Sequence, residues 1–275
     1  MTADAKDQEL VQHLDDVWAS MADLGAGLSE TEWKRGTEVP GWSVQDNLAH
    51  IAGLEWMLLG RDLPDHAIPD DLDHVKNDIG RRNEVWVDSR RGFAGNEVLA
   101  EFVEITDTRI AQLRAFAAAD FAAQTWTPVG PGAVRDLLPF RIFDSWVHEQ
   151  DMRRAVERPG NLDSVVAAVA LDRIVGSMPF VVGKRAGAPD GATVVFELSG
   201  PGARTFAIGV DGGRAKPLDA PPSAPGVRVV TDTETFARLA CGRIDPGEAL
   251  ADNRVRLEGD VALGRRVMEQ INFLF

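Results

Sequence analysis

The chain is poor in cysteine: Cys241 is the single cysteine among 275 residues. No intrachain disulfide can form, and a metal site built from several thiolates is excluded. Cys241 lies near the end of a predicted helix with no base close to it in the sequence. We therefore interpret it as a buried structural thiol rather than a nucleophile.

Positive charge is also scarce. The 29 Lys and Arg residues are outnumbered by 43 Asp and Glu residues, which gives a formal net charge of −14. Nucleic acid is an unsuitable partner for such a chain, because phosphate contacts require clustered basic residues. Anionic membrane surfaces are disfavoured for the same reason. An acidic surface is compatible with a monomer or a small homo-oligomer.

Long apolar runs and nucleotide-binding motifs are absent from the sequence. No uninterrupted apolar run approaches the ~18 residues that a membrane span needs, and residues 1–7 lack the apolar core of a signal peptide. No glycine-rich strand-to-helix motif supports nucleotide binding. With 44% hydrophobic and 26% charged residues, we expect a globular protein of the cytoplasm.

Helical periodicity dominates residues 1–158. Apolar residues recur every three or four positions, which predicts helices at 7–24, 44–59, 75–90, 97–118 and 135–156. Ser43 with Asp46 three residues later predicts a capping box at the start of the second helix. The simplest architecture for this part is an antiparallel four-helix bundle.

The pattern changes after Pro159 and Gly160, and residues 159–275 are predicted to form a second domain. A helix is expected at 163–178, strands at 193–198, 204–210, 227–231 and 255–259, and further helices ending near 239 and spanning 261–274. This alternation predicts a small, largely antiparallel sheet with helices. The whole chain is thus predicted to be α+β.

Three residues far apart in the sequence form a candidate metal site: His50, Asp144 and His148. Asp144 and His148 are four apart in a predicted helix, so they share one face of it. His50 lies in another predicted helix. If the two helices pack face to face, three ligands converge and leave one metal position open, as in catalytic sites. Two imidazoles and a carboxylate suit Zn²⁺ best, with Ni²⁺, Co²⁺ or Fe²⁺ as alternatives.

Each of these residues also has an ordinary structural interpretation. A lone histidine on an apolar helix face is usually a satisfied core residue, and an Asp–His pair at this spacing is often a surface ion pair. His13, His66 and His74 lie in polar or first-helix contexts and are interpreted as surface residues. Trp42 and Trp146 are expected to pack near the site.

The flanking residues carry a resemblance to a known family. Residues 40–50 read Pro-Gly-Trp-Ser-Val-Gln-Asp-Asn-Leu-Ala-His, which resembles the first metal motif of the mycothiol-dependent maleylpyruvate isomerase family, a group of DinB-like metal-binding helical bundles. Residues 141–151 resemble its second motif, in which a carboxylate precedes a histidine by four and an Asp follows by three. The resemblance implies metal-ligand roles for His50, Asp144 and His148.

Two further segments extend the resemblance over nearly the whole chain. Asn83, Val87 and the Arg90-Arg91 pair are similar to the family's third-helix pattern. Residues 193–275 resemble its small C-terminal domain, which is related to sterol-carrier-like folds. One position departs from the pattern, because Asp144 stands where the isomerase has Glu. Aspartate is one methylene shorter but is a competent Zn²⁺ ligand at about 2.0–2.2 Å.

The resemblance implies mycothiol as a thiol cosubstrate. A free thiol with a pKa of ~8.5 is mostly protonated at neutral pH, whereas a metal-bound thiol is deprotonated. The expected activity is therefore isomerisation of a small electrophile or S-transfer to it. The sequence leaves the substrate open and identifies no catalytic residue beyond the three ligands.

Other residues are candidates for supporting roles. Asp46, Glu55 and Asp151 are candidates for holding the far ring nitrogen of a ligand histidine. The candidates for binding the cofactor or an anionic substrate are Arg82, Arg90 and Arg141. Two other functions also fit the sequence. One is a metal-water hydrolase of a thiol conjugate or amide, and the other is a non-catalytic protein that binds metal or a ligand.

Overall fold

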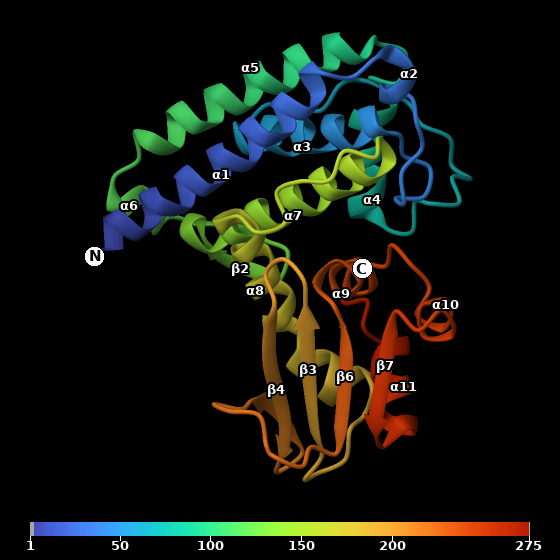
Figure 1. Cartoon of the computed structure of the whole chain (residues 1–275). Helices are drawn as coiled ribbons and strands as arrows, with labels where there is room; N and C mark the ends of the chain where they lie inside the picture. The colour runs from blue at the N-terminus through green and yellow to red at the C-terminus, as the bar shows by residue number, and fades with distance from the viewer. Residues whose placement is uncertain (1–2, 275) are drawn as a thin grey trace. The chain divides into compact units, whose positions relative to one another are not determined.

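The computed structural model describes residues 3–274 and contains two compact units, residues 1–161 and 162–275 (Figure 1). Residues 1–2, part of the N-terminal segment considered above, and Phe275 lie outside the described residues. The sequence placed the division after Arg158, and the structure places it after Asn161. Helices and strands are mixed along the chain, so the predicted α+β class is confirmed.

Unit 1 is largely helical. Its elements are α1 (Ala3–Ala26), α2 (Glu30–Trp33), α3 (Val44–Leu58), α4 (Asp78–Asp88), α5 (Gly95–Arg114), α6 (Ala118–Phe121), β1 (Gln124–Thr127), β2 (Gly130–Ala133) and α7 (Val134–Ala155). The four long helices form a ring in which α1 and α3 each contact both α5 and α7, while α4 packs on α3. The ring is compatible with the predicted antiparallel four-helix bundle, which stays a prediction.

The start of α3 fixes the position of His50. The Ser43 hydroxyl accepts a hydrogen bond from the Asp46 backbone N–H, and the Asp46 carboxylate accepts one from the Ser43 N–H at 2.8 Å. The predicted capping box is therefore confirmed. Residues 44–53 of α3 are all buried, because α3 contacts α4, α5 and α7. His50 consequently lies in the interior of unit 1.

Unit 2 contains a five-stranded sheet with helices. Its elements are α8 (Val165–Pro179), the π-helical turn η1 (Phe180–Arg185), β3 (Thr193–Ser199), β4 (Arg204–Asp211), β5 (Arg214–Pro217), β6 (Val227–Asp232), α9 (Thr233–Ala240), α10 (Pro246–Ala251), β7 (Val255–Gly259) and α11 (Val261–Glu269). The strand order is β5-β4-β3-β6-β7. Only the β3–β6 pair is parallel among these strands. The helix predicted at 261–274 ends earlier, at Glu269.

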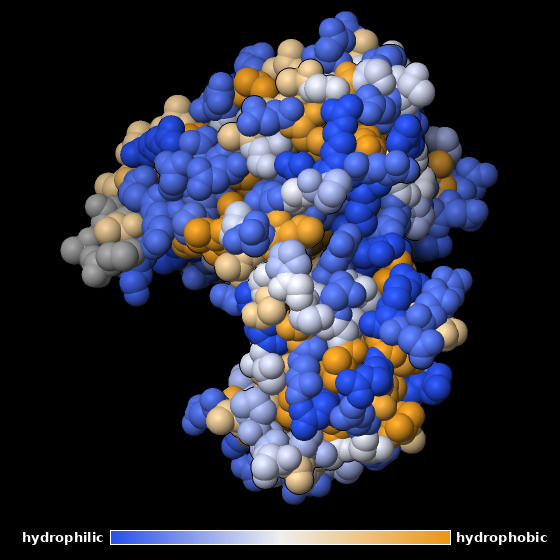
Figure 2. All heavy atoms as spheres, in the orientation of Figure 1, coloured by the Kyte–Doolittle hydropathy of each residue, from blue (hydrophilic) through white to orange (hydrophobic). Residues whose placement is uncertain are grey.

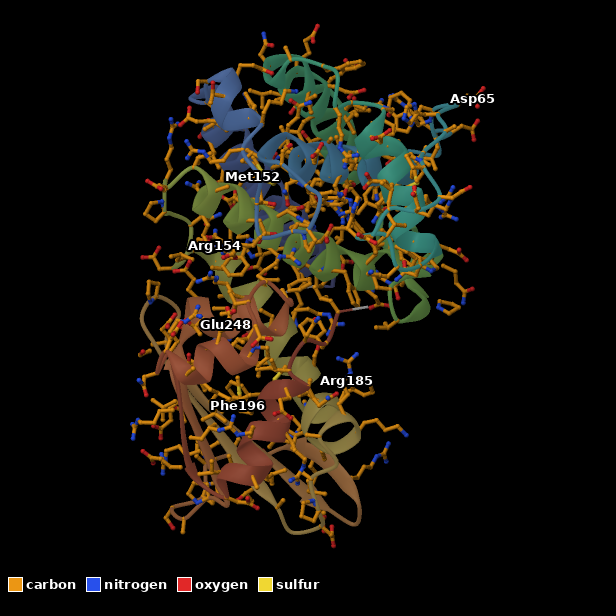
Figure 3. The ribbon with its side chains drawn as sticks, turned by 90° about the vertical axis from the view of Figure 1, so that its right-hand side faces the viewer. Asp65, Met152, Arg154, Arg185, Phe196 and Glu248 are labelled. Carbon is orange, nitrogen blue, oxygen red and sulfur yellow. The ribbon has the colours of Figure 1, made fainter. Side chains whose placement is uncertain are left out.

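Three aromatic side chains pack together in unit 2. Phe196 of β3, labelled in Figure 3, stacks on its cross-strand partner Phe206 with ring centroids 4.8 Å apart. Phe236 of α9 meets both rings edge to face. Cys241, just after α9, is 3% exposed. The prediction of a buried thiol is therefore confirmed.

One helical segment, Val165–Arg185, is long and apolar enough to cross a membrane by length and composition alone. Such a segment is weak evidence for a membrane protein, because core helices of soluble proteins meet the same criteria. Here Leu171 and Ile174 are fully buried against the rest of unit 2. The surface seen in Figure 2 is mostly hydrophilic with scattered apolar residues, as expected for a net charge of −14.

Candidate metal centre

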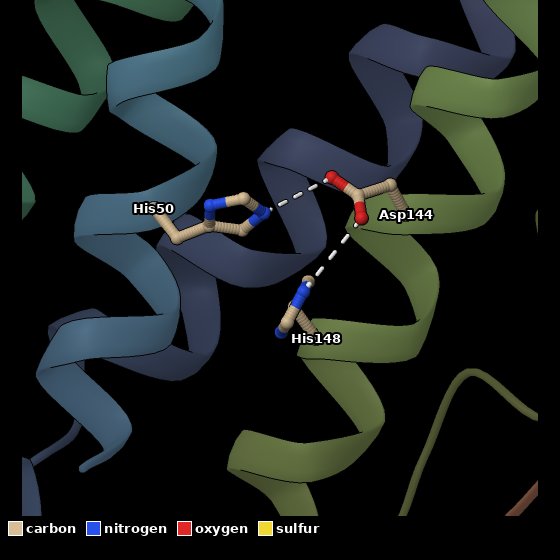
Figure 4. Close-up of side chains that lie close together, drawn as sticks. All are labelled: His50, Asp144 and His148. Atoms are coloured by element: carbon tan, nitrogen blue, oxygen red, sulfur yellow. Dashed lines mark ion pairs between the residues drawn. The ribbon is translucent and has the colours of Figure 1, made fainter. Parts of the chain in front are cut away.

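The structure brings His50, Asp144 and His148 together between α3 and α7 (Figure 4). One possible ligand atom from each residue lies within 4.8 Å of the other two. His50 Nε2 is 3.4 Å from Asp144 Oδ2, and His148 Nε2 is 3.7 Å from Asp144 Oδ1. Both imidazoles thus turn the same ring nitrogen towards one carboxylate.

The cluster is buried on its histidine side and open on its carboxylate side. His50 and His148 are 5% and 7% exposed, whereas the Asp144 side chain is 29% exposed. A small molecule could therefore approach the cluster past Asp144. That exposure is compatible with a site that keeps one position for an external ligand.

A hydrogen bond to Asn47 Oδ1 determines which nitrogen of the neutral His148 ring carries the proton. The Asn47 amide donates from Nδ2 to the Ser43 carbonyl at 2.8 Å and to Thr37 Oγ1 at 3.1 Å. Its Oδ1 is therefore the atom that lies 2.6 Å from His148 Nδ1. An amide oxygen only accepts, so Nδ1 is protonated, and in the neutral ring Nε2 then carries the lone pair. This is the tautomer that a metal ligand needs.

The residues predicted to hold the ligand histidines play different parts. Asp151 Oδ2 lies 3.6 Å from His148 Nδ1, and its other oxygen pairs with Arg154, which Figure 3 labels on α7. Asp46 caps α3, and Glu55 pairs with arginines. Asn47 was not predicted to hold a ligand histidine. Its position one turn before His50, on the same side of α3, was the available signal.

His50 is held differently from His148. Its Nδ1 is buried and has no hydrogen-bond partner among the described residues. Trp42 packs against both imidazoles, with ring centroids 5.0 Å from His50 and 5.7 Å from His148. The indole N–H of Trp42 donates to Glu84 at 2.9 Å. Trp42 therefore lies near the site as predicted, and packing rather than a hydrogen bond holds the Nδ1 side of the His50 ring.

Arg141 keeps the Asp144 carboxylate ionised. Burial by itself raises the pKa of Asp144, but the charge of Arg141 and the contacts with His50 outweigh burial and hold the pKa well below its ordinary value. Arg141 Nη1 donates to Asp144 Oδ2 at 2.6 Å. The cluster therefore offers one charged oxygen donor and two imidazole nitrogens. This donor set fits a borderline divalent cation.

The three arginines proposed for cofactor or substrate binding lie in different surroundings. Arg141 is buried beside the cluster. Arg90 pairs with both oxygens of Glu101 and lies over the Trp86 ring, with its guanidinium carbon 3.5 Å from the centroid. Arg82 is exposed on α4. The structure brings only Arg141, of these three, to the candidate metal centre, and their binding roles stay predictions.

All three histidines interpreted as surface residues are partly buried instead. His66 Nε2 lies 2.7 Å from Asp88 Oδ2, and His74 Nε2 lies 3.0 Å from Glu84 Oε2. Both contacts attach the segment between α3 and α4 to α4 itself. A sequence pattern shows polar context but not which carboxylates the chain will bring alongside. His13 is half-buried on α1.

Comparisons with known proteins agree over most of the chain. The sequence model of the mycothiol maleylpyruvate isomerase N-terminal domain matches residues 14–153, and the C-terminal domain model of the same family matches residues 168–266. A search of the curated proteins finds no match.

Solved structures give the same relationship at the level of fold. A crystal structure of mycothiol-dependent maleylpyruvate isomerase has 17% identity and a TM-score of 0.55, and it covers 89% of this chain and 93% of its own. A histidine-to-alanine mutant of that isomerase has 16% identity, a TM-score of 0.53 and the same coverage. Sterol carrier protein 2 like 2 from Aedes aegypti covers 38% of this chain and 98% of its own, at 16% identity and a TM-score of 0.31. That last value is too low to carry an argument.

Proposed function

This chain belongs to the mycothiol-dependent maleylpyruvate isomerase family, and on that premise we propose that it is a divalent-metal-dependent enzyme. It would use a low-molecular-weight thiol, mycothiol, for isomerisation of a small electrophilic substrate or for S-transfer to it. The observation that carries the proposal is the convergence of His50, Asp144 and His148 on one point. Zn²⁺ is the proposed ion, because imidazole and carboxylate donors suit it.

The chemistry needs a thiolate at neutral pH. A cation held by the three residues, with one position left for sulfur, would supply that thiolate by lowering the pKa of the thiol. The side chains of this chain prepare the site for it. Asn47 accepts a hydrogen bond from His148 Nδ1, so that Nε2 of the neutral ring is the nitrogen offered to the cation. Arg141 keeps Asp144 charged, and Trp42 covers the two imidazole rings.

Isomerisation and S-transfer share their first step in this proposal. The thiolate sulfur forms a bond to an electrophilic carbon. In S-transfer to a haloalkane, for example, the halide leaves with the electron pair of the broken bond. In isomerisation, addition to a conjugated double bond leaves a single bond that can rotate. Elimination then restores the double bond and returns the thiolate.

The proposed setting and partners follow from charge and chemistry. The expected partners are a small-molecule thiol and an electrophile, not nucleic acid or a membrane, in view of the net charge of −14. We place the protein in the cytoplasm, where thiols are kept reduced. A monomer or a small homo-oligomer is proposed.

The metal content of the purified protein tests this function. We expect one divalent cation per chain in the wild type, measured by mass spectrometry, and its loss in His148→Ala. Adding a thiol to the Co²⁺-substituted protein should change the visible absorption spectrum as sulfur binds. His66→Ala is the matched control, because it removes a unit 1 histidine that lies outside the cluster. A folded wild type that binds no cation at saturating concentration would refute the proposal.

A further inference from the structure

Three charged side chains beside the candidate metal centre are almost completely removed from solvent. Glu55 is 0% exposed, and Arg109 and Arg141 are each 5% exposed. Arg141 Nε donates to Glu55 Oε1 at 2.6 Å, and Arg109 Nε lies 3.3 Å from Glu55 Oε2. We call these three residues the Glu55 ion network. It joins α3, α5 and α7 at one point, since each helix contributes one member.

Burial of these charges needs an explanation other than stability. Removing ions from water is costly, and apolar residues of similar size often stabilise a core as well or better. The Glu55 ion network is therefore weak evidence for stabilisation. The burial of these charges is better explained by the side chains that the network holds in place. Arg141 is the member of the network that contacts the candidate metal centre, because it also donates a hydrogen bond to Asp144.

Arg141 connects the Glu55 ion network directly to a candidate ligand. Its Nε is bound to Glu55 of α3, and its Nη1 donates to Asp144 Oδ2 at 2.6 Å. The guanidinium of Arg141 is planar, and its Nε and Nη1 are both hydrogen-bonded. It therefore fixes the direction of the Asp144 carboxylate. Asp144 Oδ2 is thereby occupied, while Oδ1 faces His148 Nε2 at 3.7 Å without an arginine contact among the described residues.

The same ion pair also acts on the helix that carries His50. Aspartate has a short side chain, so its carboxylate meets the His50 ring only where α3 and α7 lie close together. The Glu55–Arg141 pair crosses between these two helices. His50 needs such support, because its buried Nδ1 has no hydrogen-bond partner among the described residues. His148, by contrast, has Asn47.

We propose that Arg141, anchored by Glu55, is a positioning residue that sets the direction of Asp144 and the approach of α3 to α7 at the metal centre. The inference rests on the proposed function, because it concerns a cation bound by His50, Asp144 and His148. It adds to that function a structural condition, namely that cation affinity depends on two residues that do not touch the cation.

Cation affinity of the full-length, metal-free protein tests the proposal. Zn²⁺ dissociation constants are measured by competition with a chromophoric chelator, and Co²⁺ binding is followed by visible absorption. The variants are Arg141→Met, Arg141→Lys and Glu55→Gln. The matched control is Arg153→Met, which breaks another buried ion pair of α7, with Glu149. Circular dichroism establishes that each variant is folded.

Arg141→Met is expected to weaken Zn²⁺ binding about 10–100-fold, the usual effect of removing a group that orients a metal ligand. Glu55→Gln should give a smaller loss in the same direction, and Arg141→Lys an intermediate one. The Co²⁺ spectrum should change in Arg141→Met, since the carboxylate is no longer held. Arg153→Met should bind within about twofold of the wild type if orientation of ligands is the cause.

Several outcomes would overturn the inference. Wild-type affinity and Co²⁺ spectra in both Arg141→Met and Glu55→Gln would show that the Glu55 ion network has only a structural role, while leaving the proposed function intact. If Arg141→Met does not fold, Arg141→Lys and Glu55→Gln decide the question by the same measurements. A folded wild type that binds neither Zn²⁺ nor Co²⁺ would remove the proposed function and this inference together.

Discussion

At the scale of single residues, Asn47 is the side chain that orients His148 within the proposed metal centre. Its amide oxygen accepts from His148 Nδ1 at 2.6 Å while its nitrogen donates to the Ser43 carbonyl. Asn47→Ala should leave the His148 ring free to rotate and to exchange tautomers. We expect Zn²⁺ affinity to fall about 10–100-fold in a chelator-competition titration.

A second asparagine provides the control for that prediction. Asn77 accepts from the Gly80 N–H at 2.8 Å and caps α4, away from the cluster. Asn77→Ala should lower the free energy of unfolding by about 1 kcal/mol without changing Zn²⁺ affinity. Equal affinities in Asn47→Ala and Asn77→Ala would show that the His148 contact has no bearing on the metal.

Ionisation of Asp144 predicts how cation binding depends on pH. Its folded-state pKa lies below the ordinary value of 3.8, so the carboxylate remains charged well into acid. A cation binds only the neutral form of an imidazole, whereas this carboxylate needs no deprotonation to bind one. Zn²⁺ affinity should fall as the pH is lowered from about 8 to 5, the range in which histidine is the usual titrating side chain.

Calorimetric titrations in buffers of different ionisation enthalpy would measure the affinity and the protons released at each pH. Binding that stays constant down to pH 5 would contradict imidazole ligation.

The folding stability of unit 1 also depends on the ionisation of Asp144. A carboxylate with a depressed folded-state pKa contributes stability above its unfolded pKa, and that contribution is lost as the pH falls through the folded pKa. Acid should therefore destabilise unit 1 through Asp144 only below about pH 4.

At the scale of secondary-structure elements, a glycine of α3 allows α4 to pack closely beside the site. A Cβ at Gly53 would lie 2.4 Å from the Trp86 ring, which is 1% exposed. Gly53→Ala gains about 1 kcal/mol of helix propensity but should lose about 1–3 kcal/mol through overpacking. We expect net destabilisation in urea unfolding.

Gly80 of α4 is the matched position in the same unit. A Cβ there would meet no atom closer than 3.5 Å, which is ordinary contact. Gly80→Ala should therefore be neutral or stabilising by up to about 1 kcal/mol. If Gly53→Ala were as stable as Gly80→Ala, the close approach of α4 to α3 would not be a constraint on the fold.

Elements with strong local signals could be predicted from the sequence, and elements that depend on distant contacts could not. The start of α3 was predicted because Ser43 and Asp46 form their capping box within one turn. The end of α11 was placed too late. Ile271 continues the apolar pattern and is fully buried, but the chain leaves the helix after Glu269, and Phe273 N–H donates to the Ala240 carbonyl. A tertiary contact thus overrides periodicity there.

Two strand regions were missed for a similar reason. The short strands of the β1–β2 hairpin contain glycine and Pro131, which have low strand propensity. The edge strand β5 reads Arg-Ala-Lys-Pro and has no apolar alternation. Only pairing with β4 reveals it.

The candidate site could likewise be predicted only where the sequence carries a local signal. Helical spacing and the motif resemblance identified His50, Asp144 and His148. Neither could identify the partners of Glu55 and Asn47, because those contacts depend on which faces of α3 and α7 meet. Glu55 was a candidate for holding a histidine, and it binds Arg141 instead.

At the scale of the whole molecule, all three candidate ligands belong to unit 1. A ligand that binds only the folded state stabilises what it binds, by about 4 kcal/mol at a thousandfold excess over its Kd. Hydrogen exchange followed by mass spectrometry should therefore slow in α3 and α7 when Zn²⁺ is added. Hydrogen exchange in the strands of unit 2 should not change. If Zn²⁺ slowed exchange there as much as in α3 and α7, a site confined to unit 1 would be contradicted.

The buried position of Cys241 has a consequence for an enzyme that handles thiols. The chain holds one cysteine, and it is 3% exposed. Thiol–disulfide exchange needs an accessible thiolate on the protein. When the small thiol in solution oxidises, its disulfide finds no accessible sulfur on this chain with which to form a mixed disulfide. The protein is therefore protected from covalent modification by the oxidised form of its own proposed cosubstrate.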